Sequence, residues 1–524
     1  MQLLASYLSG SWSAGSGSRT TLVNPATEAA LAEVSAGGHD LAGAVRFARE
    51  TGARELGTLT FAQRGALLAA LAKAVSGARE ELIALAVANG GNTRSDAKFD
   101  VDGGGVTLQH YAELGARLGS VTLLADGEPI QVGRTARMGG QHVWTRRRGV
   151  AVHINAFNFP GWGLCEKLGP ALLAGMPVIT KPATATALVA HRLVELFAPL
   201  LPAGALQLLV GPAGTLLDHC GPGDVVAFTG GSATARTLRS HPKLVEHGVR
   251  INIEADSLNA AILGPDVELT SEAGALFLAD VTRDMTQKTG QKCTATRRVF
   301  VPRAHLERVQ EDLREQLAAI KVGDPALEEV RMGPLASAQQ LAAVRAGIDL
   351  LEQSGARIVH GSRGKVEPLG VPAGKGYFVS PVLLRADDPH AARAVHEHEV
   401  FGPVATLMPY EDVADAARLV ALGKGGLVTS VYTDDRAALE ALVLGLAPWS
   451  GRILCGSSKI ADQATAPGLV LPSCVHGGPG RAGGGEELGG ERGLDFYMQR
   501  TALQGDRALL ARALGLTLEP PAEA

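Results

Sequence analysis

The feature that most constrains the fold is an alternation of short apolar runs with helical segments, which begins after residue 149. VAVHINAF, PVITKP, LQLLVG, DVVAFTG and RINIEA are rich in apolar and β-branched residues, and helically spaced segments such as TALVAHRLVELFAPLL separate them. A second series follows Glu254, with the runs NAAILG, RRVFVP, ARIVHG, VATLMPY, LVTSVYT and GRILCG. Strands that alternate with helices form βαβ units, whose parallel sheet is covered on both faces. The sequence therefore predicts two consecutive α/β domains with parallel sheets.

The segments around this alternation show other patterns. Apolar residues recur at three- and four-residue steps over 39–118, which predicts helices. SVTLLADGEPIQV and GQHVWTRRRG, within 119–149, alternate between apolar and polar residues and predict two arms of a β-ribbon around a DGEP turn. Residues 477–493 are rich in glycine, and LDFYMQRTAL predicts a terminal strand at 494–503. Exposed strand edges of this kind are normally paired or covered.

Composition excludes several classes of protein. The 524 residues are 46% apolar and 19% charged, which indicates a globular chain with more than one core. A net charge of −4 gives no sign of nucleic-acid binding, and no apolar run is long enough to span a membrane. The first residues lack the features of a signal peptide. The cysteines are few and widely spaced, which argues against disulfides or a metal site and for a cytoplasmic protein; they are Cys165, Cys220, Cys293, Cys455 and Cys474.

Polar residues and glycines follow four predicted strands of the first series. Asn158 lies in the loop after INAF, and Lys181 ends VITK. Gly230 and Gly231 follow AFT, and Glu254 ends NIE. Because open α/β sheets bind ligands beyond the carboxyl ends of their strands, these positions predict one shared ligand site.

Cys293 lies in TQKTGQKCTATRR, among glycine and small polar residues. A structural cysteine usually has apolar neighbours, whereas a nucleophilic one needs access, an environment that favours the thiolate, and a nearby base. This context favours a nucleophile, with a buried structural thiol as the alternative. The other four cysteines lack the context.

Five motifs resemble those of the aldehyde dehydrogenase superfamily, in the family's order and over nearly the whole chain. NAFNFP is similar to P-W-N-F-P, TKPA follows at the usual spacing, FTGGS is similar to F-T-G-S, GQKC to G-Q-x-C, and EVFGPV to E-x-F-G-P. The resemblance implies two Rossmann-like parallel-sheet domains and a β-ribbon oligomerisation arm, paired across a homodimer. The implied division is a dinucleotide-binding domain at 1–118 and 150–253, a catalytic domain at 254–470, and an oligomerisation ribbon and tail at 119–149 and 471–524.

Within the superfamily, EADSLNAA and VHGGPGRAGGGEELGG resemble the members that oxidise CoA-linked semialdehydes in aromatic-acid breakdown. This implies NADP-dependent oxidation of an aldehyde to an acid through a cysteine thiohemiacetal and thioester, with 3,4-dehydroadipyl-CoA semialdehyde of benzoate degradation as the substrate. Some relatives carry a hydratase domain, for which a chain that stops at 524 has no room, so we expect a stand-alone enzyme. A free semialdehyde is the alternative substrate. Arg146, Arg147 and Arg148 could attract CoA phosphates, although a solvated strand edge is the simpler explanation.

The resemblance also assigns catalytic roles. Cys293 would attack the aldehyde, and Glu254 would activate water to hydrolyse the thioester. The family's glutamate lies in E-L-G-G, but here the motif is EADS, so the local backbone must differ and Asp256 is an alternative base. The amide of Asn158 and the backbone N–H of Cys293 would stabilise the oxyanion, whereas a turn-forming asparagine is the alternative. Lys167 and Glu487 match family positions linked to proton relay or to ordering of the site. The alternative is that both are surface charges.

Further residues would bind the cofactor. Lys181 would meet the adenine ribose, the FTGG glycines and the following helix would receive the pyrophosphate, and Glu399 would hold the nicotinamide ribose. Many NAD-using members have a glutamate three residues after the lysine, where this chain has Thr184. Because a carboxylate would repel a 2′-phosphate and threonine would not, we expect a preference for NADP. The implied cofactor residues are Lys181, Thr184, Gly211, Gly230, Gly231, Ser232, Glu399 and Phe401.

Three other interpretations predict different features. A cysteine hydrolase or acyltransferase without a redox cofactor requires a histidine beside Cys293, and His153 is the available candidate. A non-catalytic binding protein would have lost the nucleophile or the base. A CoA-acylating dehydrogenase would generally lack the base, so Glu254 counts against it.

Overall fold

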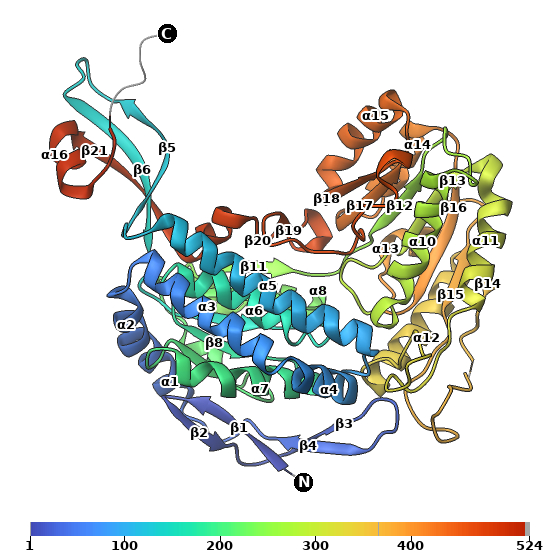
Figure 1. Cartoon of the computed structure of the whole chain (residues 1–524), viewed down its shortest axis with the longest axis horizontal. Coiled ribbons are helices and arrows are strands. Elements are labelled where there is room, and N and C mark those ends of the chain that lie inside the picture. Colours follow the sequence, from blue (N-terminus) through green and yellow to red (C-terminus); the bar gives the residue numbers. More distant parts are fainter. Residues whose placement is uncertain (1, 365, 519–524) are drawn as a thin grey trace.

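The computed structural model describes residues 2–364 and 366–518. Two large sheets with packed helices form two lobes, and a three-stranded arm extends away from the first lobe (Figure 1). A short hairpin of β19 (Val475–Gly477) and β20 (Glu486–Leu488) runs between the lobes (Figure 1).

The first sheet has nine strands, in the order β11, β10, β7, β8, β9, β1, β4 and β3, with β2 paired to β1. The strands β7 to β11, which occupy one end of this order, form the parallel series predicted from the sequence, and β1 joins the series antiparallel to β9. The strands are β1 Gln2–Leu8, β2 Ser11–Ala14, β3 Thr20–Val23, β4 Ala30–Val34, β7 Ala151–Ile154, β8 Val178–Lys181, β9 Leu206–Leu208, β10 Val225–Thr229 and β11 Arg250–Glu254.

The second sheet has seven strands, in the order β14, β15, β16, β13, β12, β17 and β18. All neighbours are parallel except β14 and β15. The strands are β12 Ala260–Leu263, β13 Arg298–Pro302, β14 Arg357–His360, β15 Val382–Arg385, β16 Val404–Tyr410, β17 Gly426–Tyr432 and β18 Ser450–Gly456.

Helices cover both faces of each sheet, as βαβ connections require. In the first lobe, α3, α5 and α6 share an apolar core with Val178, while α1 and α9 pack with its neighbour Ile179, which points to the opposite face. In the second lobe, α12, α14 and α15 pack with Ile262, whereas α10 and α11 pack with Leu263. The helices are α1 Leu41–Phe47, α2 Ala53–Gly57, α3 Phe61–Gly77, α4 Arg79–Gly90, α5 Arg94–Leu118, α6 Trp162–Leu173, α7 Ala187–Phe197, α8 Ser232–Arg239, α9 Pro242–Glu246, α10 Glu272–Thr286, α11 Leu306–Ala318, α12 Ala338–Gln353, α13 Arg393–Glu397, α14 Val413–Ala421, α15 Arg436–Leu446 and α16 Arg507–Leu514.

The arm consists of β5 (Leu124–Gln131), β6 (Met138–Arg146) and β21 (Met498–Asp506), all antiparallel. The predicted ribbon exists, but the prediction of a turn at DGEP is wrong, because those residues lie inside β5. The register of β5 shifts between Asp126 and Ile130, and the chain turns at 132–137. The terminal strand is also displaced from the predicted 494–503, because Gly490–Tyr497 form a 3-10 helix.

Three predictions made from the sequence concern the fold as a whole. The two parallel α/β sheets confirm the predicted fold class, although β1 to β4 were not predicted. Of the described helices, none is both long enough and apolar enough to cross a bilayer. The division into domains stays a prediction, and Glu254, where the catalytic domain was expected to begin, is the last residue of β11.

The register of the first sheet brings the predicted polar positions to one edge. Ile154 of β7 is opposite Lys181 on one side and Phe228 on the other, and Thr229 is opposite Glu254. The carboxyl ends of β8, β7, β10 and β11 are therefore level, which places their following loops side by side.

The loop that carries Cys293 has an unusual backbone. Lys288, Thr289 and Gly290 all have positive φ angles, of 53°, 56° and 65°. A β-carbon on Gly290 would lie 2.1 Å from the carbonyl oxygen of Gly402, so a side chain cannot fit there. The guanidinium of Arg297 donates to the carbonyls of Gly290 and Gly402, at 2.9 and 2.7 Å, and holds the two loops together.

Substituting Gly290 by Ala should destabilise the protein strongly. The left-handed backbone costs an L-residue about 1–2 kcal/mol, and the overlap with Gly402 adds to it. Gly248→Ala is the matched control, because Gly248 has a φ of +57° and no described atom within 4 Å of an added β-carbon. Urea unfolding would compare the two, and equal losses of stability would contradict the steric argument.

Candidate active site

A narrow cavity lies beyond the carboxyl ends of β7, β10 and β11, with residues of both lobes in its wall. Its free volume is about 30 Å³, which is space for one or two water molecules. Phe99, Phe159 and Trp162 form an apolar side. The polar side consists of Asn155, Asn158, Glu166, Lys167, Thr229, Glu254, Cys293, Thr294 and His476. The cavity therefore brings together Cys293, Glu254, Asn158 and Lys167 from the predicted set.

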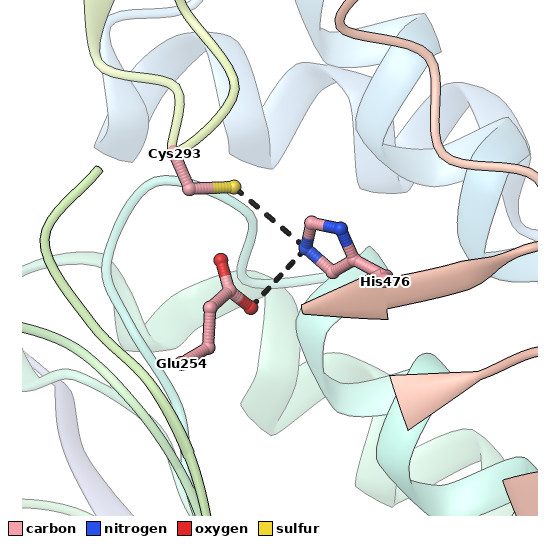
Figure 2. Close-up of side chains that lie close together, drawn as sticks. All are labelled: Glu254, Cys293 and His476. Atoms are coloured by element: carbon pink, nitrogen blue, oxygen red, sulfur yellow. Dashed lines mark hydrogen bonds and ion pairs between the residues drawn. The ribbon is translucent and has the colours of Figure 1, made fainter. Parts of the chain in front are cut away.

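Cys293, Glu254 and His476 lie close together in the wall of this cavity (Figure 2). Nε2 of His476 is 3.9 Å from Sγ of Cys293 and 3.2 Å from Oε2 of Glu254. The other carboxylate oxygen of Glu254, Oε1, is buried without a hydrogen-bond partner among the described residues and points toward Cys293 (Figure 2). The side-chain amide of Asn259 donates to the carbonyl of Cys293 at 2.8 Å and fixes the nucleophile's backbone.

The charges of the three groups depend on one another. Burial by itself would raise the pKa of Glu254, but His476 and Lys167 lower this pKa to about 2. Burial would lower the pKa of His476, but the Glu254 carboxylate outweighs it and the pKa is raised. Burial and the charge of Glu254 together raise the pKa of the Cys293 thiol. The resting site therefore holds a thiol beside a carboxylate and a histidine that stabilise each other's charged forms.

A second cluster of charges surrounds Lys167, on α6. Its Nζ is 2.9 Å from Glu166 and 3.1 Å from Glu487, and the amide of Asn252 donates to Glu487 at 3.1 Å. Carboxylate oxygens of Glu166, Glu254 and Glu487 lie within 4.8 Å of one another. The alternative that Lys167 and Glu487 are surface charges is therefore wrong, since both are buried.

Burial sets the protonation of this cluster as well. It raises the pKa of Glu487 to about 7, although Lys167 opposes the shift. For Lys167, burial favours the neutral amine, but Glu166 and Glu487 outweigh it and raise the pKa. Lys167 is thus a fixed positive charge, and Glu487 can exchange a proton near neutral pH.

His476 and Glu487 come from the hairpin of β19 (Val475–Gly477) and β20 (Glu486–Leu488). They are opposite each other in the register, so their side chains share one face. Glycines hold the hairpin close to the lobes: a β-carbon at Gly478 would lie 2.3 Å from the carbonyl oxygen of Gly426, and one at Gly483 would lie 2.2 Å from that of Ile253.

His476 is the residue of this cavity cluster that the sequence analysis missed. The choice of His153 as the partner of Cys293 is wrong, because His153 is fully buried and contacts the hydroxyl of Tyr497 at 3.2 Å. The signal that could have found His476 is the glycine-rich turn, since pairing of the flanking segments places position 476 opposite Glu487.

The cofactor residues lie along the same edge of the first sheet and in the loop before β16. Lys181 ends β8, and its Nζ contacts the carbonyl of Pro182 at 3.1 Å. Thr184 begins the 3-10 turn that follows it. Glu399 is held by Arg297 at 3.5 Å and by the N–H of Ser257 at 3.2 Å.

Phe401 and the glycines complete this set. Phe401 packs edge-on against Phe157 of the Asn158 loop, with ring centres 5.8 Å apart. Gly211 follows β9 at a φ of +89°, and Gly230 and Gly231 connect β10 to α8.

Asp256, the alternative base, has a different role. Its carboxylate accepts hydrogen bonds from the N–H and the hydroxyl of Ser232, at 2.9 and 2.6 Å. The carboxylate of Asp256 therefore binds the first turn of α8, where the sequence analysis placed the pyrophosphate of the cofactor. The carboxylate and the pyrophosphate would compete for Ser232.

Two of the three consecutive arginines at 146–148 already donate hydrogen bonds within the protein. Arg146 donates to the carbonyl of Ala53 at 2.8 Å, and Arg147 to that of Gly223 at 3.2 Å. Only Arg148 of the three is exposed.

Substituting Lys167 by Met should destabilise the protein by about 3–5 kcal/mol, because removal of one partner leaves buried carboxylates uncompensated. The loss should be largest above pH 7 and shrink at lower pH, since the pKa of Glu487 is already about 7 and protonation removes its charge. Chemical denaturation at several pH values measures this. Lys243→Met, which breaks an exposed pair with Glu246, is the control and should change stability little. A loss independent of pH would contradict the charge argument.

The chain is similar to known proteins over most of its length. A model of the aldehyde dehydrogenase family matches residues 12–503. The chain is 45% identical over 478 residues to 3,4-dehydroadipyl-CoA semialdehyde dehydrogenase of Aromatoleum evansii, over 91% of this chain and 93% of that protein. It is 29% identical over 425 residues to alpha-ketoglutaric semialdehyde dehydrogenase of Bacillus subtilis, over 79% and 82% of the two chains.

Solved structures share the fold. Betaine aldehyde dehydrogenase from Staphylococcus aureus, in complex with NAD+, has a TM-score of 0.83 at 22% identity, over 96% of this chain and 95% of that one. 3,6-Anhydro-L-galactose dehydrogenase, in complex with NADP, has a TM-score of 0.83 at 23% identity, over 96% and 100%. These findings confirm the family and the branch that the motifs indicated. The chain belongs to the aldehyde dehydrogenase family and is an enzyme that oxidises an aldehyde.

Proposed function

We propose that the protein oxidises 3,4-dehydroadipyl-CoA semialdehyde to 3,4-dehydroadipyl-CoA, with NADP as the cofactor. The observation that carries the proposal is the meeting of Cys293, Glu254 and Asn158 at one buried cavity. The relative of that name, at 45% identity over 91% of this chain, supports the choice of substrate.

In the proposed reaction, the sulfur of Cys293 bonds to the aldehyde carbon. The amide of Asn158 and the N–H of Cys293 donate to the oxygen, which gains the electron pair of the C=O π bond. NADP, when bound, accepts the hydride from that carbon. Glu254 then takes a proton from the water that attacks the thioester, and the carbon–sulfur bond breaks. The free oxygen Oε1 of Glu254 points toward Cys293 and suits this step (Figure 2).

Glu487 would carry protons away from Glu254, while Lys167, as a fixed positive charge, orders the site. Carboxylate oxygens of Glu254, Glu166 and Glu487 lie within 4.8 Å of one another, a separation over which a proton can be transferred through one intervening water molecule. The pKa of Glu487, raised by burial to about 7, lets it both accept and release a proton at neutral pH.

Lys181, Thr184 and Glu399 fit a phosphorylated dinucleotide, whereas the carboxylate of Asp256 would have to release Ser232 for its pyrophosphate. Burial lowers the pKa of Lys181. Among the described residues, the ammonium group of Lys181 donates only to the carbonyl of Pro182 and has no carboxylate partner. A phosphate of the cofactor could therefore pair with this ammonium group. Thr184 lies three positions on and brings no negative charge. Glu399, held by Arg297 and Ser257, presents a carboxylate to ribose hydroxyls.

The cavity wall and the arm support the remaining proposals. Phe99, Phe159 and Trp162 suit an apolar acyl chain, while the engagement of Arg146 and Arg147 leaves CoA phosphates to be bound elsewhere. The projecting arm, with Ile130 and Met138 exposed, suits pairing in a homodimer (Figure 1). All five cysteines are free thiols, which suits the cytoplasm.

The test is the kcat/KM with NADP for a six-carbon semialdehyde, free and as its CoA thioester. We expect the thioester to be strongly preferred, and Cys293→Ala to abolish turnover while NADP binding, measured by fluorescence titration, persists. Cys455→Ala, at an exposed free thiol, is the control and should keep full activity. Equal use of the free aldehyde would reject the substrate, and acyl-CoA formation that requires added CoA would indicate an acylating dehydrogenase.

The preference for NADP is tested at Thr184. Thr184→Glu should raise the KM for NADP about tenfold or more, because two like charges about 5 Å apart near a surface repel by about 3 kcal/mol. Thr184→Gln has the same size without the charge and should retain the preference. A wild-type ratio of NADP to NAD kcat/KM below one would overturn the proposal.

A further inference from the structure

The position of His476 is unexplained by the roles assigned above. Its Nε2 is within hydrogen-bond distance of the sulfur that reacts, at 3.9 Å, and of the carboxylate of Glu254, at 3.2 Å (Figure 2). The side chain is 4% exposed, and it lines the cavity that contains Cys293. In catalytic triads the nucleophile and the carboxylate contact different ring nitrogens of the histidine. Here both contact Nε2, so an imidazolium formed there faces the thiolate and the carboxylate together.

We propose that His476 is a catalytic residue that accepts the proton of the Cys293 thiol, and that Glu254 stabilises the imidazolium so formed. The inference rests on the proposed dehydrogenase function of the same cavity and adds the group that generates the nucleophile.

The geometry defines the step. In the neutral imidazole that can accept, the proton is on Nδ1, which points away from Cys293 and Glu254 (Figure 2). The S–H bond breaks, its electron pair stays on sulfur, and the proton bonds to Nε2. The new N–H then faces both the thiolate and Oε2 of Glu254, so one positive charge lies between two negative ones.

The other charges around His476 support this assignment. Glu166 also favours the imidazolium, whereas Arg452, on the adjacent β18, opposes it. Glu487, opposite His476 in the hairpin, adds a further carboxylate whenever it is ionised. The acidic groups outweigh Arg452, and the pKa of His476 is raised as a result.

The proton also balances over the whole cycle. The imidazolium keeps the thiol proton while the thioester exists, and returns it to sulfur when water displaces the acyl group and the carbon–sulfur bond breaks. Glu254 receives the separate proton of that water. His476 thus accepts the thiol proton, and Glu254 accepts the proton of the attacking water.

Alkylation of Cys293 by iodoacetamide tests the proposal without cofactor or aldehyde. Because Cys455 and Cys474 are exposed thiols, the rate is read at the Cys293 peptide by mass spectrometry. In the wild type, the rate should rise with pH through the raised pKa of His476 and then level off. In His476→Gln, this rise should vanish, the rate at neutral pH should fall about 10²–10⁴-fold, and only titration of the unassisted thiol at high pH should remain.

Three further variants separate the roles. Glu254→Gln should retain the rise but move its midpoint to lower pH, because the carboxylate that raises the pKa of His476 is lost. His476→Ala should regain reactivity when imidazole is added, which also shows that the variant is folded. His247→Gln, at a histidine outside the cavity lining, should behave as the wild type.

The outcomes are distinct from those of the proposed function. Unchanged alkylation in His476→Gln, or loss of the low-pH reactivity in Glu254→Gln but not in His476→Gln, would overturn the role of His476 and leave the dehydrogenase intact. A wild type that reduces no NADP with any aldehyde would reject the proposed function, whatever the alkylation rates.

Discussion

The buried pairing of Lys167 with the carboxylates of Glu166 and Glu487 is the interaction on which the site depends. It joins α6 to a hairpin more than three hundred residues later in the chain, with Nζ 3.1 Å from Glu487. A buried charge whose partner is absent lowers the free energy of unfolding by several kcal/mol. The first lobe therefore reaches its final state only when the C-terminal segment has docked, and the same docking brings His476 to Cys293.

Neighbouring carboxylates in this small region have different protonation states. The pKa of Glu254 is lowered by His476 and Lys167 to about 2 in spite of burial, whereas burial raises that of Glu487 to about 7 and that of Glu399 to about 7. Separation of pKa values by environment allows identical side chains to serve as a fixed charge and as a proton carrier. The hydrogen-bonding partners, more than the residue types, thus determine the chemistry.

The sequence predicted those features that are local or periodic. Strand alternation located the two parallel sheets, and the strand-end rule placed Asn158, Lys181 and Glu254 at one edge. It did not predict β1 to β4, which lie at the margin of the sheet, or the bulged β5, whose DGEP residues are typical of a turn. His476 is 183 positions from Cys293, and no spacing within the chain relates the two. Likewise, only the folded chain shows that Asp256 is engaged with Ser232 rather than with the nucleophile.

The close packing of the glycine hairpin has a consequence for how such an enzyme diverges. Gly478 and Gly483 accept no side chain, because the neighbouring backbone would lie within 2.3 Å of an added β-carbon. Substitution there alters the backbone, whereas substitution at position 476 alters the group presented to Cys293. Natural variation and laboratory evolution of the reaction should therefore concentrate at position 476 and spare Glu487, which is paired with Lys167. The hairpin permits new acid–base chemistry by a single codon change without a new fold.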